Sequence, residues 1–374
     1  MFFAVPSNGQ KKKKLPRPVQ MDTGVQSVRN PTTGELVFRR SAASLAVGDN
    51  APVARAAIRV RVNLVEVGCN VFAPDNTAVR GLAQPDFHIF EDDVEQSITH
   101  FDASAEGASI ALVLDASPSV LPDADTMKLA AQQLIANLSP VDEVAVVDFS
   151  EHTYLLLPFS RDRKLLEKTA AGVDVRKLFS DTGGSNIYRS VYLAANELFP
   201  GRTGRKAIIL LTDGQDSGLG LNLDGEGVRQ RRSDPPNRAT FEDVVRALAS
   251  QNIEVYAIST QNRPRVMTPA WLAAHQNVSL VTPAALDLGI PAYTDFLAEL
   301  VRRAGGQLYF LNETRTIADA YRRIVQNLSA QYTLGFYPPA GQKSGWHSLR
   351  VEVAGHGTVH IVHRTSYYAP VDSQ

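Results

Sequence analysis

The chain has 374 residues, of which 44% are hydrophobic and 21% charged, and its formal net charge is −1. This composition is typical of a folded protein of about two or three domains. The balanced charge gives no case for nucleic acid or an anionic membrane surface as a partner. A single cysteine, Cys69, excludes an intrachain disulfide framework. No stretch approaches the roughly 20 consecutive apolar residues that a membrane-spanning helix needs.

Residues 1–55 are polar, show no sustained periodicity and include four consecutive lysines at 11–14. We predict that this segment is a largely disordered leader. The lysine run is typical of a solvated tail, and a tether to an acidic surface is the alternative. The apolar start of the chain is too short for a signal peptide, so either the start is truncated or processed or the protein is not exported by that route.

Residues 56–104 have the pattern of short β-strands. Ile58, Val60, Val62 and Leu64 alternate with polar or small residues, which indicates a strand. Further short apolar runs follow at 87–90 and 97–101, separated by turn residues. We expect these strands to form one half of a small β-sandwich.

Residues 105–330 alternate between strand and helix patterns. The predicted strands are 110–114, 144–149, 153–157, 207–211, 254–259 and 307–311. The predicted helices are one through Met127, Ala131, Leu134 and Leu138, and others at 186–198, 241–250, 294–304 and 317–328. This alternation predicts an α/β fold with a doubly wound, mostly parallel, six-stranded, Rossmann-like sheet. The short link between 149 and 153 requires an antiparallel hairpin at that point.

Residues 331–370 return to a strand pattern, with runs at 332–337, 348–353 and 359–364. Neither this segment nor residues 56–104 has enough strands for an independent core. We therefore predict that the two flanking segments pair as one β-sandwich, into which the α/β domain of residues 105–330 is inserted.

Oxygen-bearing side chains follow two of the predicted strands of the α/β domain. Asp115, Ser117 and Ser119 come directly after residues 110–114, and Asp213 follows residues 207–211. Between them, Ser185 lies in a turn that reads Asp-Thr-Gly-Gly-Ser-Asn. Hydroxyl and carboxylate oxygens are the ligands that Mg²⁺ prefers. Each of these residues alone would be read as a helix cap or a turn residue, so only the ordered set indicates a metal site.

This set of motifs resembles the metal-ion-dependent adhesion site (MIDAS) of von Willebrand factor A domains. The family has Asp-x-Ser-x-Ser, then a Thr in a second loop and an Asp in a third. Ser185 stands where the family usually has Thr. The resemblance implies a strand order of 3-2-1-4-5-6, which makes the strands that end at Asp115 and Asp213 neighbours.

The resemblance also implies the roles of the site residues and the function. Ser117, Ser119 and Ser185 would contact Mg²⁺ directly, with Mn²⁺ or Ca²⁺ as alternatives, and Asp115 and Asp213 would act through water. The open position on the metal would accept an acidic side chain of a partner protein. The flanking segments resemble those of a bacterial family of A-domain-related proteins, which implies an extracytoplasmic location.

Two other functions remain open from the sequence. The cation could stabilise the fold without binding a partner, or the acids and hydroxyls could serve metal-dependent phosphoryl transfer. The second needs cationic groups aimed at phosphate, and no Gly-Lys-Ser/Thr motif, Ser-His-Asp set or Cys-His pair is evident. We therefore favour a protein-binding module over an enzyme.

Two long insertions and three isolated acids complete the sequence-based predictions. Residues 215–240 begin directly after Asp213 and should overhang the metal face, while residues 262–291 contain a short predicted helix at 270–274. Asp148, Asp181 and Asp216 lie near the metal loops in sequence. We expect each of them to be a solvated acid in a loop rather than a metal ligand.

Overall fold

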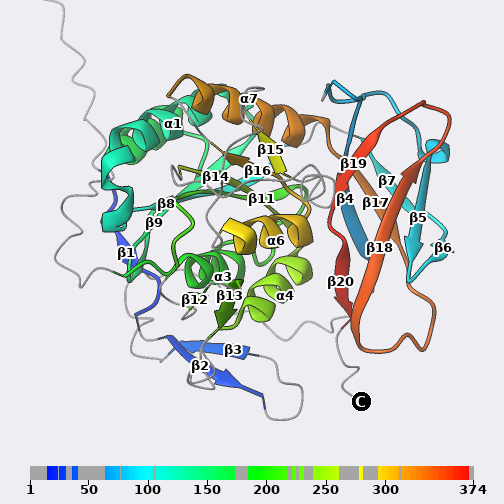
Figure 1. Ribbon diagram of the computed structural model, residues 1–374, viewed down its shortest axis with the longest axis horizontal. Coiled ribbons are helices and arrows are strands. Elements are labelled where there is room, and N and C mark those ends of the chain that lie inside the picture. The colour runs from blue at the N-terminus through cyan, green and yellow to red at the C-terminus, as the bar shows by residue number, and fades with distance from the viewer. Residues whose placement is uncertain are drawn as a thin grey trace, which may run out of the picture.

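The structure, a computed structural model, describes residues 15–23, 25–30, 36–40, 64–75, 77–103, 107–172, 184–216, 221–224, 227–230, 239–260, 278–280, 294–310 and 314–369. Two parts lie side by side, a larger α/β domain and an all-β sandwich (Figure 1). Within the described residues, no helix combines the length and the apolar character needed to cross a membrane.

The α/β domain is built on one eight-stranded sheet, in the order β1-β10-β9-β8-β11-β14-β16-β15. The strands are β1 (Val19–Gln20), β8 (Ser109–Asp115), β9 (Glu143–Phe149), β10 (Thr153–Ser160), β11 (Lys206–Thr212), β14 (Ile253–Ser259), β15 (Val278–Leu280) and β16 (Leu308–Phe310). The six predicted strands follow the order 3-2-1-4-5-6, and the hairpin of β9 and β10 is antiparallel, as expected. The sheet gains β1 and β15, which were not predicted, as its two edges.

Three described helices pack on each face of this sheet (Figure 1). One face carries α1 (Ala124–Asn137), α2 (Arg163–Ala171) and α7 (Thr314–Ala330), and the other carries α3 (Ile187–Leu198), α4 (Phe241–Gln251) and α6 (Thr294–Ala304). The central strands are buried on both faces, which explains their continuous apolar runs. Two 3₁₀ turns complete the described helices: η2 (Gln84–Asp86) and η3 (Pro118–Asp123).

The prediction of a largely disordered leader is wrong for the part of residues 1–55 that the structure describes. This part contains β1 and a hairpin of β2 (Val25–Arg29) with β3 (Leu36–Arg40). Met21 and Leu36 are buried in the core beneath α3 and α4. Isolated apolar residues in a polar segment carry no periodic signal, so the sequence pattern did not reveal this docking. The lysine run lies outside the described residues.

The flanking segments pair as one sandwich, as predicted. One sheet has the order β19-β4-β17-β7 and the other β20-β18-β5-β6, so each sheet combines strands from both sides of the α/β domain. The strands are β4 (Val65–Phe72), β5 (Phe87–Glu91), β6 (Val94–Gln96), β7 (His100–Asp102), β17 (Tyr332–Phe336), β18 (Gly345–Val353), β19 (His360–His363) and β20 (Ser366–Ala369). Their inward-facing side chains form a separate core that contains Cys69. Residues 57–63 of the first predicted strand lie outside the described part.

The sandwich contacts the amino-terminal ends of the parallel strands. Gly68 on β4 faces Glu254 at the start of β14 and Gln331 at the end of α7, whose amide donates a hydrogen bond to Glu254. Arg364 is buried and donates to the carbonyl of Ala249 at the end of α4, with Nη1 and O 2.9 Å apart. These contacts place the sandwich at the amino-terminal ends of the strands, opposite the loops that follow β8 and β11.

The two insertions contain structure that the sequence did not predict. The first contributes a hairpin of β12 (Leu221–Asp224) and β13 (Gly227–Gln230). The second contributes β15, which pairs in parallel with β16 at the sheet edge. The helix predicted at 270–274 lies outside the described residues.

Candidate metal centre

The first loop of the predicted site leaves the carboxyl end of β8. Asp115 is the last residue of β8 and is buried, and its Oδ1 accepts a hydrogen bond from the Ser117 amide at 2.9 Å. The hydroxyls of Ser117 and Ser119 lie 3.1 Å apart, with Ser117 buried and Ser119 exposed. The loop thus brings one carboxylate and two hydroxyls together at a surface.

The third loop leaves the neighbouring strand, β11, at the same edge of the sheet. Thr212 is fully buried and donates from its hydroxyl to Asp115 Oδ2 at 2.6 Å. Its hydroxyl also accepts from the amide of Gly214 at 3.0 Å. Asp213 is buried, and its Oδ1 accepts from the Gln215 amide at 2.9 Å. Thr212 therefore links the first and third loops directly.

The second loop provides Ser185, a buried residue just before α3. The following residue, Asn186, donates from its amide to Ser150 O at 2.9 Å and from Nδ2 to Glu151 O at 2.6 Å. The first turn of α3 is joined to the third loop, because the Tyr188 amide donates a hydrogen bond to Asp216 Oδ2 at 3.3 Å. Hydrogen bonds to both neighbouring loops thus fix the chain around Ser185.

The electrostatics of these loops favour a cation. Burial, together with the charge of Asp213, raises the pKa of Asp115 to about 7, although hydrogen bonds from Ser117 and Thr212 oppose this rise. Two buried carboxylates that repel each other are costly unless a proton or a cation compensates their charge. Small hard oxygen donors beside them match the preferences of Mg²⁺. The residues therefore fit a small divalent cation.

The described residues contain no group of three or more His, Cys, Asp and Glu side chains that could hold a metal ion. The predicted site does not depend on such a group, because three of its five members are serines. The predicted metal site becomes evident only when the serine hydroxyls are counted as ligands together with Asp115 and Asp213.

One of the three acids near the loops, Asp148, differs from expectation. Asp148 is buried within β9, beside Leu114 in the parallel register, so the prediction of a solvated loop acid is wrong. Burial raises its pKa to about 7. Asp216 accepts the Tyr188 hydrogen bond and braces α3. Asp181 lies outside the described residues.

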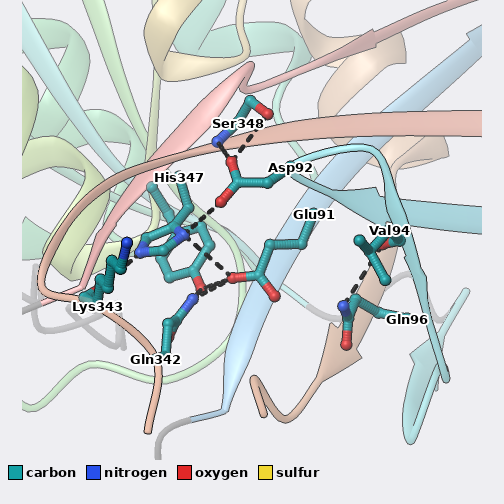
Figure 2. Close-up of polar contacts among 9 residues, drawn as sticks. Glu91, Asp92, Val94, Gln96, Gln342, Lys343, His347 and Ser348 are labelled. Carbon is teal, nitrogen blue, oxygen red and sulfur yellow. Dashed lines mark hydrogen bonds and ion pairs between the residues drawn. The ribbon is translucent and has the colours of Figure 1, made fainter.

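A second polar cluster lies in the sandwich and had no sequence signal (Figure 2). Its centre is His347, whose Nδ1 lies 2.8 Å from Asp92 Oδ2 and whose Nε2 lies 2.7 Å from the carbonyl oxygen of Lys343. Glu91 Oε1 lies 3.6 Å from the same Nδ1 and accepts hydrogen bonds from Tyr367 and Gln342. The cluster joins the turn after β5 to the loop before β18. The two sides are far apart in sequence, with 251 residues between Glu91 and Gln342 and 255 between Asp92 and His347.

Comparison with known families identifies one domain. Residues 109–267 match the family model described as the von Willebrand factor type A domain. The match begins at the first residue of β8 and includes Asp115, Ser117, Ser119, Ser185 and Asp213. A comparison with curated proteins found no match.

Several solved structures are similar to this chain at low identity. BatB from Bacteroides thetaiotaomicron is 16% identical over 60% of this chain and 98% of that chain, with a TM-score of 0.41. The vWF domain of the pili tip protein Mfa5 from Porphyromonas gingivalis is 12% identical over 60% and 96%, with a TM-score of 0.41. Proximal thread matrix protein 1 from the mussel byssus, with a zinc-occupied MIDAS motif, is 18% identical over 63% and 48%, with a TM-score of 0.39.

Proposed function

Residues 109–267 form a von Willebrand factor type A domain, and from this premise we propose that the chain is a metal-ion-dependent protein-binding module. The metal is Mg²⁺, with Mn²⁺ or Ca²⁺ as alternatives. The residues that would hold it are Asp115, Ser117, Ser119, Ser185 and Asp213. The partner is a protein that offers an acidic side chain.

One observation carries this proposal. Asp115 ends β8 and Asp213 directly follows the neighbouring parallel strand β11, and both are buried close enough for the charge of Asp213 to raise the pKa of Asp115. Ligands of open α/β sheets bind at the carboxyl ends of strands where the strand order reverses, and β8 and β11 flank that point. A cation bound there would offset the repulsion between the two acids.

The character of the donors supports binding of an anionic group. Serine hydroxyls are neutral, so a site with few carboxylates in direct contact leaves much of the charge of the cation uncompensated. A bound cation of this kind supplies electrostatic attraction for a carboxylate. The exposed position of Ser119 keeps this side of the site open to a partner. For the same reasons, and because the sequence lacks a phosphate-binding motif, we propose binding rather than catalysis. An extracytoplasmic location is proposed from the family resemblance.

Magnesium titration by calorimetry tests the metal site. We expect one Mg²⁺ to bind the metal-free chain, and we expect Asp213→Asn to weaken binding by about 10-fold or more, as loss of a ligand-supporting carboxylate does in other metal sites. The matched control is Asp93→Asn in the sandwich, whose side chain is 91% exposed, and it should bind as the wild type does. Absence of binding for Mg²⁺, Mn²⁺ and Ca²⁺ to the wild type would refute the proposal.

A second experiment separates partner binding from a structural role. Acidic peptides are compared with their Asn and Gln counterparts for binding to the magnesium-loaded chain, before and after EDTA. The proposal expects binding that needs both the carboxylate and the metal. If EDTA lowers the melting temperature and no acidic peptide binds, the cation has a structural role only.

A further inference from the structure

The segment before the sandwich contacts the α/β domain next to the second metal loop. Val19 and Gln20 of β1 pair with Leu155 and Tyr154 of β10, and the Met21 amide donates to Thr153 O at 2.8 Å. We call residues 19–22 the N-terminal arm. The arm continues the sheet up to the turn between β9 and β10, where its last residue, Asp22, lies.

Asp22 joins two elements that are separate in sequence. Its Oδ2 lies 2.9 Å from Nδ1 of His152 in the β9–β10 turn and 3.6 Å from Nη2 of Arg189 in the first turn of α3. The Asp22 side chain is only 3% exposed, whereas His152 and Arg189 are 39% and 45% exposed. A buried carboxylate is tolerated only with such partners, so Asp22 holds the turn against the helix.

The turn and the helix that Asp22 joins are the two supports of Ser185. On one side, Ser150 O and Glu151 O in the turn accept the hydrogen bonds from Asn186. On the other side, the Ser190 hydroxyl of α3 bonds to Asn186 O and to the Thr153 hydroxyl, each at 2.8 Å. Loss of the Asp22 contacts would remove one of the links between the turn and α3 and loosen the chain at Ser185.

We propose that Asp22 is a positioning residue for the second metal loop, so that the N-terminal arm is part of the metal centre although it precedes the matched domain by more than 80 residues. This inference rests on the proposed function, because Ser185 is assigned to the metal there. Asp22 does not contact the cation. It acts by fixing the distance between the β9–β10 turn and the start of α3. Preorganised ligands bind metal more tightly because less order must be imposed on binding.

The test compares loss of Asp22 with loss of another contact of the same N-terminal segment. Arg29 forms a bidentate pair with Asp243 on α4, with Nη–Oδ distances of 3.1 and 2.7 Å, so this pair anchors the segment to a different element from the β9–β10 turn. Asp22→Asn and Arg29→Ala are therefore a matched pair of variants. Both weaken docking of the N-terminal segment on the α/β domain, but only Asp22→Asn removes a contact of the β9–β10 turn. Magnesium affinity and the melting temperature in EDTA are measured for the full chain.

We expect Asp22→Asn to raise the Kd for Mg²⁺ by about 3- to 10-fold, less than the roughly 10- to 100-fold loss for residues that bond directly to metal ligands, because Asp22 acts through the turn and α3. Arg29→Ala should lower the melting temperature in EDTA and leave the Kd unchanged. Equal losses of affinity in both variants, or a Kd for Asp22→Asn within about twofold of the wild type at the precision of calorimetry, would overturn the proposal.

If Asp22→Asn does not fold, variants of the partly exposed His152 test the same contact. His152→Ala should weaken Mg²⁺ binding, and His152→Gln, which keeps a donor for Asp22, should restore it.

If the wild type binds no metal, hydrogen exchange of residues 184–192 in the metal-free chain still tests whether Asp22 holds the turn against α3. Exchange there should be faster in Asp22→Asn than in Arg29→Ala, and equal rates contradict the inference.

Discussion

Thr212 shows how a single hydroxyl connects the two strands of the metal centre. It donates to Asp115 and accepts from the Gly214 amide, so its two hydrogen bonds tie the end of β8 to the loop after β11. Both bonds are buried, which makes them costly to break. The carboxylate of Asp115 is consequently held close to Asp213 even though the two charges repel. The two loops therefore hold an unfavourable contact between carboxylates that a bound cation would relieve.

Replacement of Asp115 by asparagine should separate this stored repulsion from metal binding. Asp115→Asn removes one of the two charges and keeps the shape of the side chain. We expect the melting temperature in EDTA at pH 8 to rise by about 2–4 °C, which corresponds to roughly 1 kcal/mol for a domain of this size. The stabilisation by Mg²⁺ should be lost at the same time. A lower melting temperature in EDTA would show that the hydrogen bonds of Asp115 outweigh the repulsion.

The hydroxyl of Ser185 can be tested without changing any charge. Ser185→Ala removes the donor oxygen, and we expect it to weaken Mg²⁺ binding by about 10-fold or more. Ser185→Thr keeps the oxygen and restricts its rotamers, because β-branched side chains are stiff at χ1. Threonine should therefore bind Mg²⁺ as tightly as serine or a few-fold more tightly. If both variants bind like the wild type by calorimetry, Ser185 is not a ligand.

At the scale of elements, the sequence predicted those whose signal is local. The apolar runs of β8 and β11 predicted these strands, and the three-residue link before β10 predicted the hairpin, whereas the sheet order was implied by the family resemblance. By contrast, β1 has two residues, and its docking depends on one buried side chain, Met21, far from its partners in sequence. Helix α2 was also missed, although Asp162, which caps it by accepting from the Leu165 amide, is a signal that could have revealed it.

The contacts of the candidate site fall into the same two groups, those with a local sequence signal and those without one. The placement of Asp115, Ser117, Ser119 and Asp213 at one edge of the sheet could be predicted, because each follows an apolar run that ends there. The brace by Asp22 and the cluster around His347 could not, since they depend on pairs separated by 130 and 255 residues. Such contacts exist only once the fold has formed.

The cluster around His347 predicts a pH dependence of the loop that it holds (Figure 2). Both ring nitrogens face acceptors, Asp92 and Lys343 O, so the ring is fully paired only when both nitrogens carry protons. Burial lowers the pKa of His347, but these hydrogen bonds and the charges of Asp92 and Glu91 outweigh burial, and the pKa is raised. The stability that this pair contributes is therefore fully present below about pH 6.5, the unfolded value, and is lost as pH rises through the folded value.

Urea unfolding of the wild type and His347→Gln, in EDTA at pH 5.5 and pH 8.5, measures this contribution. The free energy of unfolding of the wild type should exceed that of His347→Gln by more at pH 5.5 than at pH 8.5. The difference between the two proteins removes the effect of all other titrating groups. A difference that is constant with pH would mean that His347 keeps one protonation state throughout.

At the scale of the whole molecule, the sandwich and the α/β domain share an interface where strands approach closely. A Cβ atom on Gly68 would lie 2.7 Å from Glu254 Oε1 and closer still to the Gln331 amide. Glycine in a strand is ordinarily less favourable than alanine by about 0.5–1 kcal/mol. At Gly68 the close approach makes glycine more favourable than alanine. The absence of a side chain there lets the sandwich pack against the α/β domain.

Gly68→Ala should therefore destabilise the chain, by about 1–3 kcal/mol as overpacked sites do. The measurement is urea unfolding followed by fluorescence, with the double variant Gly68→Ala/Gln331→Ala as the second arm of a cycle. Truncation of Gln331 removes one of the two atoms in the way, so the double variant should lose less than the sum of the single losses. Stabilisation by Gly68→Ala alone would show that the interface has room.

The placement of the metal loops and the sandwich at opposite ends of the same parallel strands has a mechanical consequence. The chain leaves the sandwich from β7 and returns through β17, and these two strands are hydrogen-bonded neighbours, with Asp102 opposite Thr333. Tension applied at the metal loops would run lengthwise along the sheet and reach both strands at the same end. It would then act as shear on the five residue pairs between β17 and β4. Hydrogen bonds loaded in shear bear force together rather than one after another. The attachment through β17 and β4 therefore resists extraction of the inserted domain better than bonds that break one at a time.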